Sequence, residues 1–113
     1  MRKSLTRRER LKGRTAIRRV FSAGKSVERK GIKLLFVQNS LSRNRIAVCP
    51  VRGFRTAVER NRAKRLCREA YRDLKHQIAP GYDIVFVLYP GQVTLRDRHR
   101  QMESLLERVG LKR

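Results

Sequence analysis

Cationic side chains recur at helical spacing between residues 55 and 75, and the chemistry open to them is the neutralisation of phosphate. Lys64, Arg68 and Arg72 are four residues apart, so on a helix they share one face. Exposed helix faces normally mix acids and bases, whereas like charges at this spacing repel by about 0.2–0.5 kcal/mol per pair. A solvated surface is the ordinary alternative. The repulsion favours a polyanionic partner instead.

The segment that must position these cations has the period of a two-faced helix. Thr56 and Glu59 have the spacing of a reciprocal N-terminal cap, and Pro80 should end the helix by about Ile78. One face is apolar and predicts contact with a core: Ala63, Leu66, Cys67, Ala70, Tyr71, Leu74 and Ile78. The opposite face is almost wholly basic, with Glu69, Asp73 and Arg62 at its flank: Asn61, Lys64, Arg65, Arg68, Arg72 and Lys75.

Composition agrees with a nucleic-acid partner. The chain has 113 residues, of which 30 are Lys or Arg and 9 are Asp or Glu, for a formal net charge of +21. Such an excess draws a protein to polyanions. With 40% hydrophobic residues the chain can fill one modest core, so we expect a single domain. Neither a membrane span nor a secretory signal is seen, and we expect a cytoplasmic protein without membrane association.

No catalytic constellation of its own is visible in the chain. The acids are scattered singly, and His99 and His76 are expected to be solvated. Cys49 and Cys67 have no metal-ligand spacing and are expected to be reduced core residues. The tripeptide from Gly24 to Ser26 lacks the first glycine of a phosphate-binding loop. We therefore predict no catalytic residue, and neither a metal nor a cofactor bound by the protein alone.

The remaining segments predict an α+β domain over residues 15–113, preceded by a flexible basic arm over residues 1–14. A first helix from about residue 15 should end at Gly24 in the left-handed conformation. The runs 32–37 and 46–51 predict a hairpin, with a weaker strand at 26–29. The apolar run 82–89 predicts a central strand. A last helix capped by Thr94 and Asp97 should end before Gly110 and bury one face: Leu95, Met102, Leu105, Leu106 and Val109.

The segment from Ala57 to Arg72 closely resembles the signature helix of the bacterial ribonuclease P protein component, with its Arg60-Asn61-Arg62 core followed by Lys64-Arg65. The resemblance is strong there and looser over the rest of residues 11–109. It implies a sandwich of helices on a mixed, four-stranded sheet with a left-handed βαβ crossover. It also implies a protein that binds the catalytic ribonuclease P RNA and assists removal of the 5′ leader from precursor tRNA, while the RNA and its Mg²⁺ ions perform the chemistry.

The resemblance further assigns two surfaces. The catalytic RNA would contact one of them, formed by the central helix: Arg60, Asn61, Arg62, Lys64, Arg65, Arg68 and Arg72. The single-stranded leader would enter a groove between the first helix and the sheet, with Phe21, Leu35 and Arg52 as candidates. Leu35 departs from the usual Tyr and Ile17 from a usual Phe, and the turn at 53–55 exchanges Gly with the basic residue. No obligate protein partner is expected.

Two other classes share parts of this pattern. A ribosomal or other structural RNA-binding protein would have the same charge, size and α+β layout, and the RNA that co-purifies would distinguish it. A DNA-binding regulator would need a recognition helix that projects into a major groove. The central helix is instead long and expected to pack on a sheet, which disfavours this class.

Overall fold

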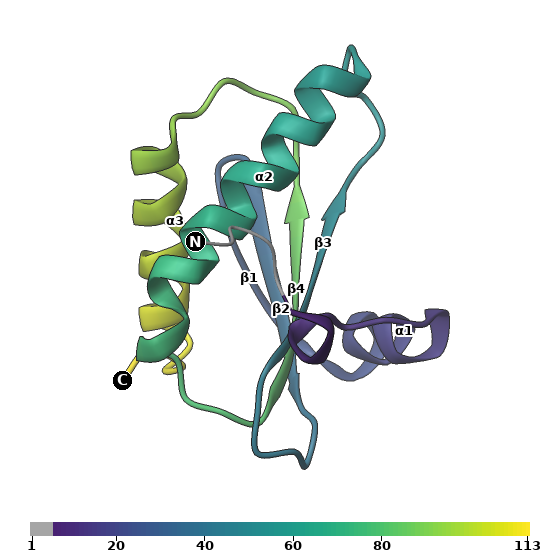
Figure 1. Cartoon of the computed structure of the whole chain (residues 1–113), viewed down its shortest axis with the longest axis vertical. Helices are drawn as coiled ribbons and strands as arrows, with labels where there is room; N and C mark the ends of the chain where they lie inside the picture. Colours follow the sequence, from purple (N-terminus) through teal and green to yellow (C-terminus); the bar gives the residue numbers. More distant parts are fainter. Residues whose placement is uncertain (1–5) are drawn as a thin grey trace.

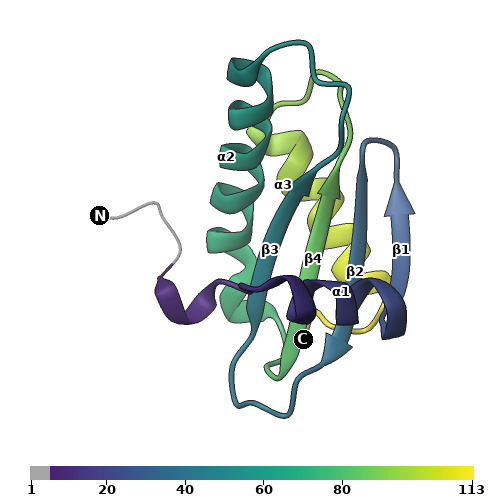
Figure 2. The same ribbon diagram turned by 90° about the vertical axis from the view of Figure 1, so that its right-hand side faces the viewer.

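In the computed structural model, which describes residues 6–113, three helices pack on a four-stranded sheet. The helices α2 (Ala57–Leu74) and α3 (Leu95–Arg108) cover one face of the sheet, and α1 (Arg14–Ala23) crosses the other face (Figures 1 and 2). This confirms the predicted α+β architecture. The elements are η1 (Arg7–Glu9), α1 (Arg14–Ala23), β1 (Lys25–Arg29), β2 (Ile32–Gln38), β3 (Arg45–Pro50), α2 (Ala57–Leu74), η2 (Lys75–Gln77), β4 (Tyr82–Leu88) and α3 (Leu95–Arg108). Within residues 6–113 no helix combines the length and apolarity needed to cross a membrane.

The strand order is β1-β2-β4-β3, so the predicted pairing of 32–37 with 46–51 is wrong. β4 lies between them, antiparallel to β2 and parallel to β3. From Asp83 to Leu88 every residue of β4 is buried, and a strand that is apolar on both faces gains most burial at the centre of a sheet. The hairpin is instead formed by β1 and β2, which meet at Gly31 with φ of +89°.

The main core lies between the sheet and the pair α2 and α3. All the predicted apolar residues of the central helix are buried, from Ala63 to Ile78. From α3 the core receives Met102, Leu105 and Leu106, as predicted. Leu95 is 38% exposed, which corrects its assignment, because it is the first residue of α3 and the buried part of the helix begins later.

The helix caps follow the sequence with two corrections. The Thr56 hydroxyl accepts a hydrogen bond from the Glu59 N–H at 3.1 Å, but the Glu59 carboxylate does not return the contact. At α3 the cap between Thr94 and Asp97 is reciprocal, as predicted. Gly24 is extended, with φ of −79°, rather than left-handed. Glycine is required there because a Cβ atom would lie 2.8 Å from the carbonyl oxygen of Phe36.

The segment before α1 differs from the expected flexible arm over the part that the structure describes. The Leu11 N–H donates to the Ile46 carbonyl at 2.7 Å, and Arg10 forms an isolated parallel bridge to the same residue. The Leu11 side chain is only 4% exposed and packs in the cluster under α1. Residues 10 and 11 therefore pair with the edge strand β3, and burial of the Leu11 side chain helps to hold this segment in place. Residues 1–5 of the predicted arm lie outside the described residues.

Candidate nucleic-acid interface

The basic face of α2 is positioned by the burial of the opposite face of the helix. Because Leu66, Ala70 and Leu74 are fixed against the sheet and α3, residues about half a turn away must point outward. Asn61 and Arg65 are exposed. The other members are half-buried, as expected of long side chains whose stems lie on the helix while their charged ends reach water: Lys64, Arg68 and Arg72. We call these five residues the α2 basic face.

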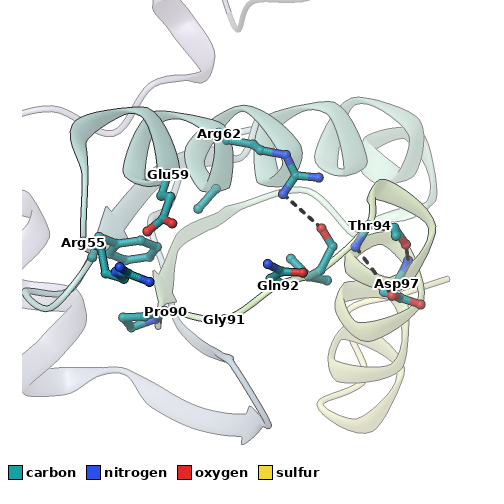
Figure 3. A pocket seen from close by; sticks show the side chains of 11 residues that line it. Arg55, Glu59, Arg62, Pro90, Gly91, Gln92, Thr94 and Asp97 are labelled. Carbon is teal, nitrogen blue, oxygen red and sulfur yellow. Dashed lines mark hydrogen bonds between the residues drawn. The ribbon is translucent and has the colours of Figure 1, made fainter.

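Arg60 and Arg62 lie on opposite flanks of that face, since consecutive residues of a helix are about 100° apart. Arg60 is exposed. Arg62 is exposed as well, but its Nη1 donates a hydrogen bond to the Val93 carbonyl at 3.2 Å. Figure 3 shows its guanidinium directed toward the loop between β4 and α3. The seven predicted RNA-binding residues thus form one five-residue face and two separate flanks.

The positive charge of the α2 basic face is not compensated by acids within residues 6–113. The ion pairs there are Arg45–Asp83, Lys75–Glu9 and the contacts of Lys112 with two α3 carboxylates. None of them includes a residue of the α2 basic face. Lys75, which the sequence placed on the same side, is bound to Glu9 at 2.9 Å instead. The uncompensated cations are therefore those between residues 61 and 72.

The α2 basic face borders the edge strand β3, beside which α2 runs (Figure 2). The pKa of the Cys49 thiol on β3 reflects this proximity. Burial raises this pKa, whereas the positive charge of Lys64 is close enough to act in the opposite direction. The Cys49 side chain packs in the cluster on the α1 side of the sheet. One continuous surface therefore leads from the basic helix across β3 toward the sheet face that α1 crosses.

The three leader-groove candidates are not equivalent in the structure. Phe21 of α1 is 49% exposed, and Arg52 is exposed in the turn that follows β3. Leu35 is only 4% exposed and packs with Val20 of α1 and Val85 of β4. Leu35 therefore supports α1 from below, whereas Phe21 and Arg52 present their side chains to solvent.

Two ionisable side chains of α2, Cys67 and Tyr71, are buried in the core and do not face this surface. Burial raises the pKa of the Cys67 thiol to about 12, so it is uncharged at neutral pH. The pKa of the Tyr71 hydroxyl is also raised, first by burial and then by the charge of Glu9. Within residues 6–113 no group of three His, Cys, Asp or Glu side chains could hold a metal ion. The arrangement can bind phosphate and nucleobases.

A pocket at the start of α2 was not predicted from the sequence. It has a volume of about 630 Å³ and lies between the turn before α2, the first turns of α2 and the loop that leads to α3 (Figure 3). Its walls include Phe54, Glu59, Arg62 and Gln92. The turn residues at 53–55 and 90–91 predicted two loops in the sequence. They did not predict that these loops lie side by side and form a pocket.

Comparison with known proteins gives one consistent result. A family model described as Ribonuclease P matches residues 5–110. The Ribonuclease P protein component of Caldanaerobacter subterraneus subsp. tengcongensis is 36% identical over 105 residues, which cover 93% of this chain and 87% of that protein. The one from Thermotoga petrophila is 34% identical over 115 residues, covering 96% and 98%.

Solved structures agree with these sequence matches. The RNase P protein from Thermotoga maritima superposes with a TM-score of 0.79 at 30% identity and covers 88% of this chain and 96% of that one. The RNase P protein of Staphylococcus aureus has a TM-score of 0.81 at 22% identity, with 93% and 98% covered, and shows that the fold is shared.

Proposed function

The chain belongs to the ribonuclease P protein family and acts as the protein subunit in 5′ maturation of tRNA, and from this premise we propose that the α2 basic face binds the ribonuclease P RNA. The observation that supports the proposal is the segregation of charge on α2. The apolar residues are buried, while the cations opposite them have no acidic partner within residues 6–113. Phosphates of the RNA would reduce the repulsion among these cations and would give each of them an anionic partner.

Precursor tRNA would contact the second surface. We assign the single-stranded 5′ leader to the sheet face beside α1, where exposed Phe21 can stack on a base; exposed Arg52, in the turn at the far end of β3, can bind a phosphate farther along the strand. Buried Leu35 would contribute by holding α1 against the sheet. Because this face adjoins the α2 basic face along β3, one protein could contact the leader and the catalytic RNA together.

The phosphodiester chemistry is assigned to the RNA. The residues of the α2 basic face are cations and one amide, and cations do not ligate Mg²⁺. Within residues 6–113 no group of three His, Cys, Asp or Glu side chains could hold a metal ion either, so these residues do not fit a metal site of their own. Mg²⁺ in the holoenzyme would therefore be held by RNA phosphates. We propose a cytoplasmic location on the basis of this RNA-dependent role.

Reconstitution tests the proposal. Purified, nuclease-treated protein is combined with precursor tRNA and Mg²⁺, with and without the ribonuclease P RNA, and 5′ cleavage is followed. We expect the protein to stimulate cleavage by the RNA at low Mg²⁺ and to show no cleavage by itself. Unchanged RNA activity on addition of the protein, or co-purification with ribosomal RNA alone, would overturn the assignment.

A further inference from the structure

We propose that the pocket at the start of α2 binds one unpaired guanine base of RNA, a proposal that rests on the RNA-binding function above. Its volume of about 630 Å³ lies within the range of about 300–1,000 Å³ that is usual for small-molecule sites. Three separate segments form its walls: the turn at 54–55, the first turns of α2, and the stretch from Pro90 to Asp97 in the first turn of α3. The pocket is thus open to solvent, and its walls are brought together by tertiary contacts.

Its apolar walls suit a flat ring. Phe54 supplies an aromatic side chain, and Ala63, Pro90 and Val93 add further apolar surface. Phe54 is half-buried and packs against the main core, so the ring is held in place from behind. Nucleobases that leave a stack are commonly bound on such aromatic surfaces.

The charge of the pocket distinguishes it from the α2 basic face. Two cations, Arg55 and Arg62, and two carboxylates, Glu59 and Asp97, line it. The lining is therefore balanced, although the whole chain carries 30 basic and 9 acidic residues. A phosphate would be repelled by the carboxylates, whereas a neutral base can use both donors and acceptors. The balance favours a base over a backbone phosphate.

Glu59 is the group that gives the pocket its specificity. Its backbone N–H is bound by Thr56, but its carboxylate does not complete the cap and forms no hydrogen bond or ion pair with another residue in 6–113. Figure 3 shows this carboxylate on the pocket side, toward Arg55 and Pro90. The carboxylate of Asp97, by contrast, is occupied by the reciprocal cap of α3. Only Glu59 offers a carboxylate that is free to accept from a ligand.

Among the four RNA bases, guanine matches a free carboxylate best. Its Watson–Crick edge presents two adjacent donors, N1–H and the 2-amino group, which can bond both oxygens of one carboxylate. Adenine and cytosine place an acceptor beside their amino group, and uracil flanks its single N–H with two carbonyls. The remaining acceptors of guanine, O6 and N7, are those that arginine binds, and Arg55 and Arg62 line the same pocket.

The position of the pocket on α2 lets one RNA strand use both sites. The pocket is built around the first turns of α2, and the α2 basic face begins on the same turns with Asn61. A strand whose phosphates lie along the basic face could therefore turn one base into the pocket. Such a contact would fix the register of the RNA, which phosphate contacts alone do not specify.

The test is an NMR titration of the ¹⁵N-labelled full chain with three single-stranded pentauridines whose central nucleotide is replaced by guanosine, inosine or adenosine. We expect the guanosine strand to shift the amide signals of Gly91, Gln92 and Val93 and to bind about tenfold more tightly than the inosine strand, which lacks the 2-amino donor. The adenosine strand should bind more weakly still. Glu59→Gln should remove the preference for guanosine, because the amide keeps one acceptor oxygen but replaces the other with an NH2 donor, which cannot pair with the second N–H donor of guanine.

Glu69→Gln is the matched control, since it makes the same charge change on α2 outside the pocket and should leave the ratio of affinities unaltered. The pocket assignment is overturned if the three strands bind equally, if the guanosine strand does not bind, or if Glu59→Gln keeps the preference. Any of these results together with normal stimulation of precursor-tRNA cleavage would reject the pocket alone. Loss of that stimulation in the unaltered protein would reject the proposed function instead.

Discussion

The Nζ atom of Lys75, at the end of α2, lies 2.9 Å from the Oε2 atom of Glu9 in the segment before α1. Burial by itself would raise the pKa of the Glu9 carboxyl, but the hydrogen bonds from Lys75 and Thr6 outweigh burial and lower this pKa. The pair ties residues 6–13 to the helix that carries the α2 basic face. It also gives Lys75 a partner that the cations between residues 61 and 72 lack.

Alanine substitutions on the α2 basic face should each reduce the salt dependence of RNA binding. For Lys64→Ala, Arg68→Ala and Arg72→Ala we expect the slope of log K against log salt to fall by about 0.7–0.9 unit, the contribution of one neutralised phosphate. Filter binding to ribonuclease P RNA at several salt concentrations measures the slope. Arg108→Ala on α3 is the control for a loss of bulk charge, and an equal fall in that variant would argue against a defined binding face.

Lys75→Ala should reduce the same slope by clearly less than Lys64→Ala does. The charge of Lys75 is already compensated by Glu9, so Lys75 should displace few counterions from the RNA on binding. Its substitution should therefore change the slope little. Because the pair is partly exposed, the free energy of unfolding should change by less than about 1 kcal/mol. Parallel salt titrations and urea melts check both quantities. A slope change in Lys75→Ala as large as that in Lys64→Ala would show that Lys75 leaves Glu9 and binds a phosphate of the RNA in the complex.

Opposite faces of α2 should respond differently to truncation. Leu66 is 6% exposed, so Leu66→Ala should lower the free energy of unfolding by about 2–5 kcal/mol through a cavity. Arg65 and Asn61 are exposed, and their alanine variants should change stability by less than about 0.5 kcal/mol. In the complex with RNA, loss of a charge-assisted hydrogen bond from Arg65 should cost about 1.5–3 kcal/mol.

Thermal melts paired with cleavage assays at low Mg²⁺ separate these effects. Early melting of Arg65→Ala combined with normal cleavage by the reconstituted holoenzyme would show that the α2 basic face is structural.

Acid should weaken the fold through Asp83. This carboxylate is 1% exposed and accepts two hydrogen bonds from Arg45, at 2.8 and 2.7 Å, across the β3–β4 pair. Burial by itself would raise its pKa, but the bonds from Arg45 and Asn39 outweigh burial and lower it. A lowered pKa stabilises the folded state above the unfolded value of about 3.9, and this contribution is lost as the pH falls through the folded value.

We therefore expect Asp83→Asn to unfold more easily at neutral pH, by about 1–3 kcal/mol, and the difference from the unaltered protein to shrink below about pH 4. Urea melts between about pH 3 and pH 7 measure this difference. Asp73→Asn, at an exposed position of α2, is the control and should show little pH dependence of its effect. A difference for Asp83→Asn that is constant with pH would refute the assignment.

Much of the local structure was predictable because it depends on residues close in the sequence. The apolar and basic faces of α2 follow from a period of 3.6 residues, and the buried face is confirmed from Ala63 to Ile78. The reciprocal cap of α3 depends on Thr94 and Asp97 alone. The central position of β4 follows from its unbroken apolar run. The residues proposed to bind RNA on α2 could therefore be named without a structure.

The tertiary structure decided what depends on residues far apart in the sequence. β4 separates β2 from β3 because a strand buried on both faces takes the centre, and a sequence pattern does not specify which strands become its neighbours. Leu11 pairs with β3 through a hydrogen bond to Ile46, 35 residues later, so its segment lacked any local signal of order. Arg62 and Glu59 lie beside the loop after β4 only because α2 begins at the end of the sheet where β4 ends. The sequence alone thus determined the basic helix face, whereas long-range packing created the pocket beside it.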